Sequence, residues 1–310
     1  MNISIVPSFL CNGSCEYCYL GNSIHNKETI DLSKLVDRIK EVSKAEGIND
    51  FQFDVFGGEI CLLDRGYIET LFEMLSGFTT SKIMVTTNLT NFKRSVELLH
   101  DKRLMVATSL NDERKKIDFI ARKNIMRLSE TDRQNLSVLV VVTPSVLQKP
   151  IRDILVDLET LKIGGVRFLQ YYPSANARVR YDILVSQYES FCLQLIYEYN
   201  NGGYSFELLN IPFWKSFKVY SVDNVFVMPN GNFATTQYNN GIESFVEFED
   251  YASFRSYSER EYIEHVAKCS LCPYFSCCLA EHICNEKDCC GLRSISEFLS
   301  THDRYSNSIA

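Results

Sequence analysis

Short apolar runs alternate with amphipathic segments over residues 2–176, and few folds accommodate such an alternation. The apolar runs are rich in β-branched residues and predict buried strands at 3–6, 51–56, 82–87, 104–110, 136–143 and 166–171. Between them, apolar residues three and four apart predict helices at 31–45, 65–75, 92–99, 114–127 and 151–161, the first with start signals at Thr29 and Asp31. The chain is therefore expected to form an α/β fold with a parallel sheet inside its helices, as a doubly wound sheet or a partial barrel.

Residues suited to binding or catalysis follow several of the predicted strands. In both kinds of parallel fold, active sites lie at the carboxyl ends of the strands. We therefore expect the functional site at this edge of the sheet. Tyr171 and Tyr172 would either shape a substrate pocket there or pack as ordinary aromatic residues. The residues at strand ends are Cys11, Gly57, Gly58, Glu59, Asn88, Ser109 and Tyr171.

The composition argues against nucleic-acid and membrane partners. The 310 residues are 45% hydrophobic, enough for a sizeable core, and the formal net charge of −7 is spread along the chain. A nucleic-acid binder needs a basic surface, which this charge pattern does not supply. The sequence has neither a signal-peptide start nor a run of about 18 apolar residues, and therefore predicts a soluble, cytoplasmic protein.

The pattern changes after a helix expected at 185–200. Residues 224–238 predict two antiparallel strands joined by a turn at Pro229, Asn230 and Gly231. A helix at 259–268, a cysteine-rich stretch at 269–290 and a last helix at 294–301 are expected to follow. We therefore expect two domains, comprising residues 1–204 and 205–310.

Twelve cysteines in a chain expected to occupy a reducing compartment favour metal or iron–sulfur ligation over disulfides. Ten of them fall into two groups, at 11–18 and at 269–290. Cys61 and Cys192 stand alone, and we expect both to be buried in apolar packing.

The first group, Cys11, Cys15 and Cys18, occupies the loop after the first predicted strand. Three thiolates on a [4Fe–4S] cluster leave one iron open to bind a substrate or cofactor, and this is the interpretation we favour. A zinc knuckle that lacks its fourth ligand and a chance grouping of cysteines are the alternatives.

These motifs resemble those of the radical SAM superfamily. CNGSCEYC at 11–18 matches the family's CxxxCxxC with an aromatic residue before the last cysteine, and FGGE at 56–59 matches its GGE motif. TTN at 86–88 and TSLND at 108–112 stand where members often carry TTNG and SLDG. The resemblance implies a partial (β/α)6 TIM-like barrel in which Cys11, Cys15 and Cys18 hold the catalytic cluster and S-adenosylmethionine (SAM) chelates the open iron. Reductive cleavage of SAM would then release a 5′-deoxyadenosyl radical that abstracts hydrogen.

The resemblance also implies a set of SAM-binding residues. Gly57 and Gly58 would let the backbone approach a ligand closely, and Glu59 offers a carboxylate to the ammonium group of SAM. A flexible turn is the plain alternative for the two glycines. Ser109 and Arg122 stand where relatives hold the ribose and the carboxylate, although a helical arginine often belongs to a solvated face. The implied set is Tyr17, Phe56, Gly57, Gly58, Glu59, Asn88, Ser109 and Arg122.

The stretch at 269–290 resembles the SPASM or twitch extension, which binds auxiliary [4Fe–4S] clusters. Its CxxCx5C spacing is present, but Thr236 and His282 stand where members carry further cysteine ligands. We therefore expect one auxiliary cluster. The alternatives are a second, irregular cluster or a zinc ribbon. The expected ligands are Cys269, Cys272, Cys278 and Cys290, with Cys289 or Cys284 as other closing ligands, and the irregular cluster would use Cys277, Cys284 and Cys289.

Members with such extensions mostly modify peptides, so the expected function is oxidation, cross-linking or epimerisation of a ribosomally made peptide or a protein side chain. A radical SAM dehydrogenase or epimerase of a small natural product is the alternative. A non-catalytic metal scaffold is a third interpretation, against which the intact motifs argue. The shared motifs build only the radical generator, so they do not identify the substrate.

The expected partners are a flavodoxin- or ferredoxin-type reductant and the substrate itself. Because Cys11 lies near the start of the sequence, any leader peptide is expected to be recognised by the C-terminal region or by a separate protein. Residues 206–227 would then offer a strand edge to a peptide, or else belong to the core. Cys192, Cys277 and Cys284 are candidate hydrogen donors, and the sequence points to no general base.

Overall fold

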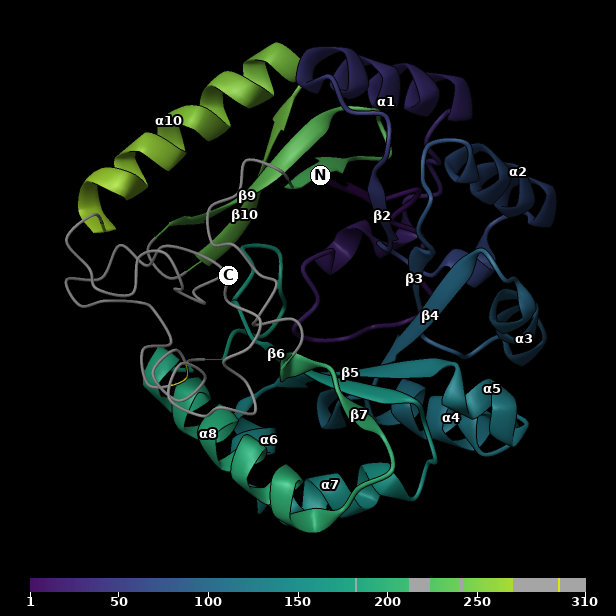
Figure 1. Cartoon of the computed structure of the whole chain (residues 1–310), viewed down its shortest axis with the longest axis vertical. Coiled ribbons are helices and arrows are strands. Elements are labelled where there is room, and N and C mark those ends of the chain that lie inside the picture. Colours follow the sequence, from purple (N-terminus) through teal and green to yellow (C-terminus); the bar gives the residue numbers. More distant parts are fainter. Residues whose placement is uncertain (182, 212–223, 240–241, 270–294, 296–310) are drawn as a thin grey trace.

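A computed structural model describes residues 1–181, 183–211, 224–239, 242–269 and 295 of the chain. Within these residues ten strands form one sheet, in the order β10-β9-β8-β1-β2-β3-β4-β5-β6-β7. The strands from β8 through β1 to β7 run parallel to their neighbours, and β9 and β10 are added antiparallel at one edge. Figure 1 shows the strands inside a ring of helices. The α/β fold is confirmed, and of the two predicted architectures the structure has the partial barrel.

The elements up to residue 202 agree with the predicted ones to within two residues at each end. The parallel strands are β1 Asn2–Ile5, β2 Gln52–Val55, β3 Ile83–Thr87, β4 Leu104–Ser109, β5 Leu136–Val142, β6 Gly165–Gln170, β7 Glu207–Leu208 and β8 Asn224–Val227. The helices between them are α1 Leu32–Glu46, α2 Arg65–Ser76, α3 Phe92–His100, α4 Lys115–Ile125, α7 Ile151–Glu159 and α8 Val185–Gly202. The sequence did not reveal α5 Glu130–Gln134 and α6 Pro144–Leu147, because a helix of about one turn shows no periodicity.

Each barrel strand buries one face against the helices and turns the other toward the barrel interior. Along β5, every second residue from Leu136 to Val142 is buried, and the residues between them are partly exposed. The central strand β3 alternates in the same way, from Ile83 to Thr87. The buried residues form one core with the apolar faces of α1, α2, α7 and α8. The core therefore lies between sheet and helices, and the inner face of the strands stays partly accessible.

The first helices begin at side chains that cap them. Asp31 accepts a hydrogen bond from Lys34 N at 2.9 Å, which confirms the predicted start of α1. Asp64 caps α2 in the same way through Tyr67 N, at 3.0 Å. Capping residues stand directly after the strand–loop segments, so each helix turns back along the outside of the sheet.

The second half of the chain continues the same sheet. The turn predicted between β8 and β9 Phe233–Asn239 is confirmed, with Met228 N donating to Asn232 O at 2.9 Å and Gly231 in the left-handed region at φ +78°. β10 Ile242–Phe248 pairs with β9. Residues on both sides of position 205 thus share one sheet, and a division into two domains there stays a prediction.

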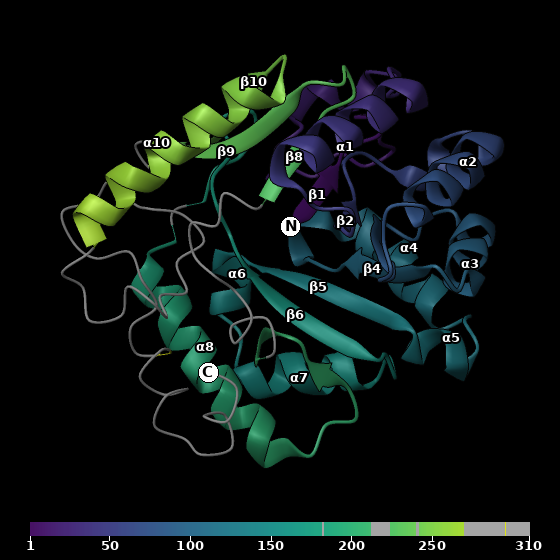
Figure 2. The same ribbon diagram turned by 45° about the horizontal axis from the view of Figure 1, so that its top comes forward.

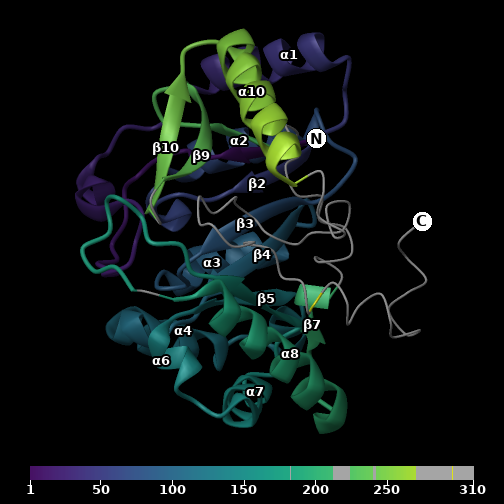
Figure 3. The same ribbon diagram turned by 90° about the vertical axis from the view of Figure 1, so that its left-hand side faces the viewer.

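Helix α10 Tyr251–Cys269 lies across β9 and β10 beside α1, whereas α7 and α8 pack side by side under β5 and β6 (Figure 2, Figure 3). α10 begins eight residues before the predicted start, because Tyr251 and Phe254 are buried against Phe233. In the ranges that the structure describes, no helix has the length and apolarity needed to cross a membrane.

Candidate functional site

The loop after β1 carries the three predicted cluster ligands and is held by backbone hydrogen bonds. Cys11 N donates to Ile24 O at 2.9 Å, which closes the loop on itself. Within the loop, Cys18 N donates to Cys15 O at 3.2 Å and Gly21 N donates to Cys18 O at 3.1 Å. Cys11, Cys15 and Cys18 therefore lie on one compact segment at the carboxyl end of β1.

Gly13 shows how closely two of the thiols approach each other. A Cβ atom built on Gly13 would lie 3.3 Å from Cys11 Sγ and 3.7 Å from Cys15 Sγ. Gly13 N also donates to Cys11 Sγ at 3.3 Å. The two sulfurs therefore lie on either side of Gly13, where Ile117 Cδ1 packs even closer, 2.7 Å from the position of a Cβ atom.

The three thiols are partly buried, and burial raises the pKa of Cys11, of Cys15 and of Cys18, the last to about 11. A bound iron would reverse this preference, because a coordinating thiol loses its proton. Among the residues that the structure describes, no three His, Cys, Asp or Glu side chains form a group that could hold one metal ion. A [4Fe–4S] cluster has a different requirement, since each thiolate binds a separate iron. The thiols of Cys11, Cys15 and Cys18 therefore suit a [4Fe–4S] cluster better than a single metal ion.

The GGE motif packs against the cysteine loop. Gly58 N donates to Ser8 O at 2.9 Å and Glu59 N donates to Leu10 O at 2.7 Å. A Cβ on Gly58 would lie 2.1 Å from Leu10 O, and Gly57 has a φ of +139°, which favours glycine. The close backbone approach that the two glycines allow is thus an approach to the cysteine loop itself.

Glu59 holds the ends of two neighbouring strands together. Its buried carboxylate accepts from Thr87 Oγ1 at 2.6 Å, from Asn88 N at 2.6 Å and from Cys61 N at 3.1 Å. Asn88 in turn donates through Nδ2 to Asn12 Oδ1 at 2.8 Å, within the cysteine loop. A network of hydrogen bonds therefore joins three of the predicted site segments at one end of the barrel.

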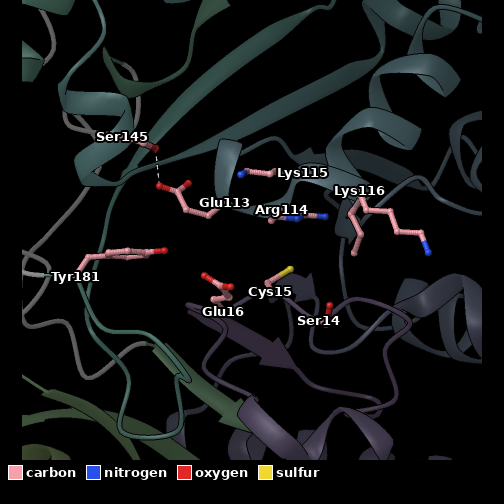
Figure 4. A pocket seen from close by; sticks show the side chains of 10 residues that line it. Ser14, Cys15, Glu16, Glu113, Arg114, Lys115, Lys116, Ser145 and Tyr181 are labelled. Carbon is pink, nitrogen blue, oxygen red and sulfur yellow. Dashed lines mark hydrogen bonds between the residues drawn. The ribbon is translucent and has the colours of Figure 1, made fainter.

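A cavity of about 510 Å³ opens beside Cys15 (Figure 4). Its volume lies in the range of small-molecule sites, and its charged groups of both signs suit a ligand that carries an ammonium and a carboxylate, as SAM does. The lining residues are Ser14, Cys15, Glu16, Glu113, Arg114, Lys115, Lys116, Ile117, Ser145 and Tyr181.

Arg114 is one of the cavity residues that were not predicted from the sequence. Its side chain is 7% exposed, donates to Ser109 O at 2.9 Å and lies 3.5 Å from the Asp118 carboxylate. The guanidinium also lowers the pKa of Cys15, against the larger effect of burial. Arg114 ends the short 3-10 helix η3 Asp112–Arg114 in the loop after β4, so a search for charged residues in the loops that follow the strands would have found it.

Aromatic residues close the other side of the cysteine loop. Tyr17, a predicted SAM-binding residue, meets the buried Tyr171 edge to face, with ring centroids 6.3 Å apart. Tyr171 contacts Tyr181 at 5.6 Å, and Val179 N donates to Glu16 O at 2.9 Å. The segment after β6 therefore covers the cysteine loop, and Tyr171 both packs and borders the site.

The structure brings most, but not all, of the predicted SAM-binding residues together. Ser109 ends β4 beside Arg114, and Phe56 meets Phe226 at 6.0 Å on the interior side of the sheet. Arg122 lies elsewhere, because its guanidinium pairs with Asp157 of α7 at 2.7 Å, on the outer surface. Arg122 therefore does not join the other predicted residues in this structure.

Cys61 and Cys192 are 4% and 0% exposed, which confirms that both are buried in packing. Cys192 lies in the core, and this burial argues against it as a hydrogen donor. The side chains predicted to bind an auxiliary cluster lie outside the described residues. They are Cys269, Cys272, Cys278 and Cys290, with Cys277, Cys284 and Cys289 as alternatives.

No protein-family model and no curated protein matches the chain. Solved structures do match. One is native anSMEcpe with bound AdoMet (SAM) and the Cp18Cys peptide, with a TM-score of 0.63 and 14% identity over 96% of this chain and 95% of that one. Streptococcus suis SuiB bound to S-adenosylmethionine has a TM-score of 0.61 and 15% identity over 90% of this chain and 72% of that one. At such identities the similarity establishes the fold. The chain therefore has the partial-barrel fold of radical SAM enzymes, with the three-cysteine loop at the carboxyl end of β1.

Proposed function

We propose that this chain is a radical SAM enzyme that binds a [4Fe–4S] cluster through Cys11, Cys15 and Cys18 and modifies a peptide or protein side chain. The observation that carries the proposal is the convergence of these thiols beside a charged cavity, at the strand ends where this fold has its active sites. When bound, the cluster and SAM supply a 5′-deoxyadenosyl radical able to remove hydrogen from an unactivated carbon.

The chain's own residues would position these groups. Gly58 and Glu59 fix the cysteine loop against β2, and Asn88 holds the loop from the side of β3. Arg114 presents a buried guanidinium beside Cys15, where it suits the carboxylate of SAM, and we add it to the predicted binding set in place of Arg122. These roles stay proposals, as do those of Tyr17, Phe56, Gly57 and Ser109.

A peptide substrate is supported by the fold similarity to a structure that contains both AdoMet and a peptide. A flavodoxin- or ferredoxin-type reductant would supply the electron. An auxiliary cluster in the SPASM or twitch manner, and a separate protein that recognises a leader peptide, are further parts of this proposal. A small precursor-peptide gene beside the gene for this chain would favour the peptide over a small natural product.

The test is the iron content and SAM cleavage of anaerobically reconstituted protein. We expect about eight irons per chain, falling to about four in Cys11→Ala/Cys15→Ala/Cys18→Ala, and we expect the wild type but not this triple variant to form 5′-deoxyadenosine with dithionite. Cys192→Ala, which removes a cysteine of the core, is the matched control and should keep both properties. About twelve irons would point to two auxiliary clusters. Wild-type protein that forms no 5′-deoxyadenosine would overturn the proposed function.

A further inference from the structure

The inner face of the barrel carries two charged residues among the strands β1 to β6, all of which the structure describes. Phe53 and Val55 of β2 are buried in the core under the helices, so Asp54 between them faces the interior. On β6, Val166 and Phe168 face the helices, and Arg167 therefore faces inward. Small, apolar or uncharged polar residues occupy the other inward positions of these six strands.

Asp54 and Arg167 act on each other across the barrel. The sheet order places four strand spacings between β2 and β6, about 19 Å in a flat sheet, beyond a Debye length of about 8 Å in physiological salt. The guanidinium of Arg167 nevertheless lowers the pKa of Asp54. Figure 1 shows the sheet curving inside the ring of helices, so the inner faces of β2 and β6 turn toward a common interior.

The Asp54 carboxylate has a buried oxygen without a hydrogen bond to any residue that the structure describes. Asp54 Oδ1 is buried and accepts no hydrogen bond within the part of the chain that the structure describes. A buried acceptor without a donor costs about 1–3 kcal/mol, which is a reason to expect that something else satisfies it. Arg167 has five N–H donors in a planar fork, so it can serve a ligand in addition to any acceptor in the protein.

Building on the function proposed above, we propose that Asp54 and Arg167 form a subsite inside the barrel that binds an amide group of the substrate. The Asp54 carboxylate accepts the amide N–H, and the Arg167 guanidinium donates to the amide oxygen. Charge favours this class of ligand. A cation that approaches Asp54 is repelled by Arg167, and an anion that approaches Arg167 is repelled by Asp54. A neutral amide can bond to both groups without such repulsion.

Other ligands fit less well. A hydroxyl group donates and accepts at a single oxygen, so it matches two side chains on different strands less well than an amide, whose N–H and oxygen are separate atoms. A free zwitterion carries both charges, but burying two full charges costs more than burying an amide. The neighbouring inward residues Met84 and Leu139 are partly exposed and would contact the apolar part of an amide-bearing substrate.

The test uses three deuterated probes with reconstituted protein, SAM and dithionite. They are N-acetylalanine N′-methylamide, glycerol and alanine, each with deuterium on carbon. A probe held in the barrel passes deuterium to the methyl group of 5′-deoxyadenosine, which mass spectrometry detects. We expect more label from the amide than from glycerol or alanine. In Asp54→Leu/Arg167→Met, which removes both charges together, label from the amide, measured per 5′-deoxyadenosine formed, should fall about tenfold.

A second readout needs no cofactor. Saturation-transfer NMR on the cluster-free protein should detect the unlabelled amide probe with the wild type and lose it with the double variant. Asp37→Leu and Arg65→Met make the same changes at exposed positions and should leave both readouts as in the wild type. Unchanged amide signals in the double variant, or more label from alanine than from the amide, would overturn the subsite. A lack of 5′-deoxyadenosine in the wild type would overturn the proposed function, while the NMR result still decides whether the amide binds.

Discussion

Replacing Asp54 by asparagine should change the stability of the chain in a way that depends on pH. The free energy of unfolding of Asp54→Asn, minus that of the wild type, should be larger at neutral pH than at acidic pH. Burial raises the pKa of Asp54 from its ordinary value of 3.8 to about 6, even though the guanidinium of Arg167 lowers it. A carboxyl group with a raised pKa in the folded chain stabilises the fold below its unfolded pKa. This stability is lost as the pH rises through about 6.

The magnitude follows from the two pKa values. Their separation corresponds to about 3 kcal/mol, of which about 2 kcal/mol is lost between pH 4 and pH 7. Asparagine keeps the size of the side chain but does not titrate. The free energy of unfolding of Asp54→Asn, minus that of the wild type, should therefore increase by about 2 kcal/mol over this range. A cost of this kind is expected at a binding residue, where stability is sacrificed for function.

Urea unfolding of both cluster-free proteins, followed by circular dichroism from pH 4 to pH 7 at constant ionic strength, measures this difference. Titrating groups common to both proteins cancel in the subtraction. Asp37→Asn, at an exposed position, should show no comparable trend. A difference between Asp54→Asn and the wild type that stays constant with pH would refute the reasoning, because it would mean that the folded chain leaves the pKa of Asp54 unperturbed.

Three further substitutions test the packing of the site. Gly58→Ala would place a Cβ atom 2.1 Å from Leu10 O and should lower the free energy of unfolding by about 2 kcal/mol or more. In the control Gly66→Ala the Cβ atom would lie 3.2 Å from Asp64 Oδ1, so its cost in the same urea assay should be much smaller. Thr87→Val removes the hydroxyl that donates to Glu59 and should lower the free energy of unfolding by about 1–3 kcal/mol. An unchanged urea midpoint would show that the buried Glu59 carboxylate does not depend on this hydroxyl. Thr70→Val, at an exposed position, is the control. Arg114→Gln removes the cation that lowers the pKa of Cys15, so alkylation of Cys15 by iodoacetamide at pH 8 should slow in the cluster-free protein. Cys18, whose pKa is raised by its own burial and by Cys15 and Cys11, should react as before, and equal slowing of both thiols would contradict a specific effect of Arg114.

The local features of the chain were readable from its sequence. The boundaries of the predicted strands and helices up to residue 202 agree with the periodicity of apolar residues, because an element of several turns or residues shows its buried face through spacing alone. The start of α1 was readable because a cap is a contact between residues three positions apart. The cysteine loop was readable for a similar reason, since its three thiols lie within eight positions of one another.

The choice between arginines shows where this reasoning ends. The spacing of residues on α4 shows on which face of the helix Arg122 lies, but it does not show which residue packs against the Arg122 side chain. In the folded chain that partner is Asp157 on the outer surface, while Arg114, in the loop between β4 and α4, lines the cavity. The hydrogen bonds of Glu59 to Thr87 and Asn88 were hidden in the same way, because they join the ends of different strands.

By itself, then, the sequence determined the order of strands and helices, the edge of the sheet that carries the site and the three thiols on their loop. Only the tertiary structure decided that the sheet curls into a barrel, that Arg114 lies beside Cys15 and that Asp54 faces the same interior as Arg167. The physical reason is that the periodicity of apolar residues indicates which positions are buried within one helix or strand. Contacts across the barrel depend on the curvature and closure of the whole sheet, which no short segment encodes.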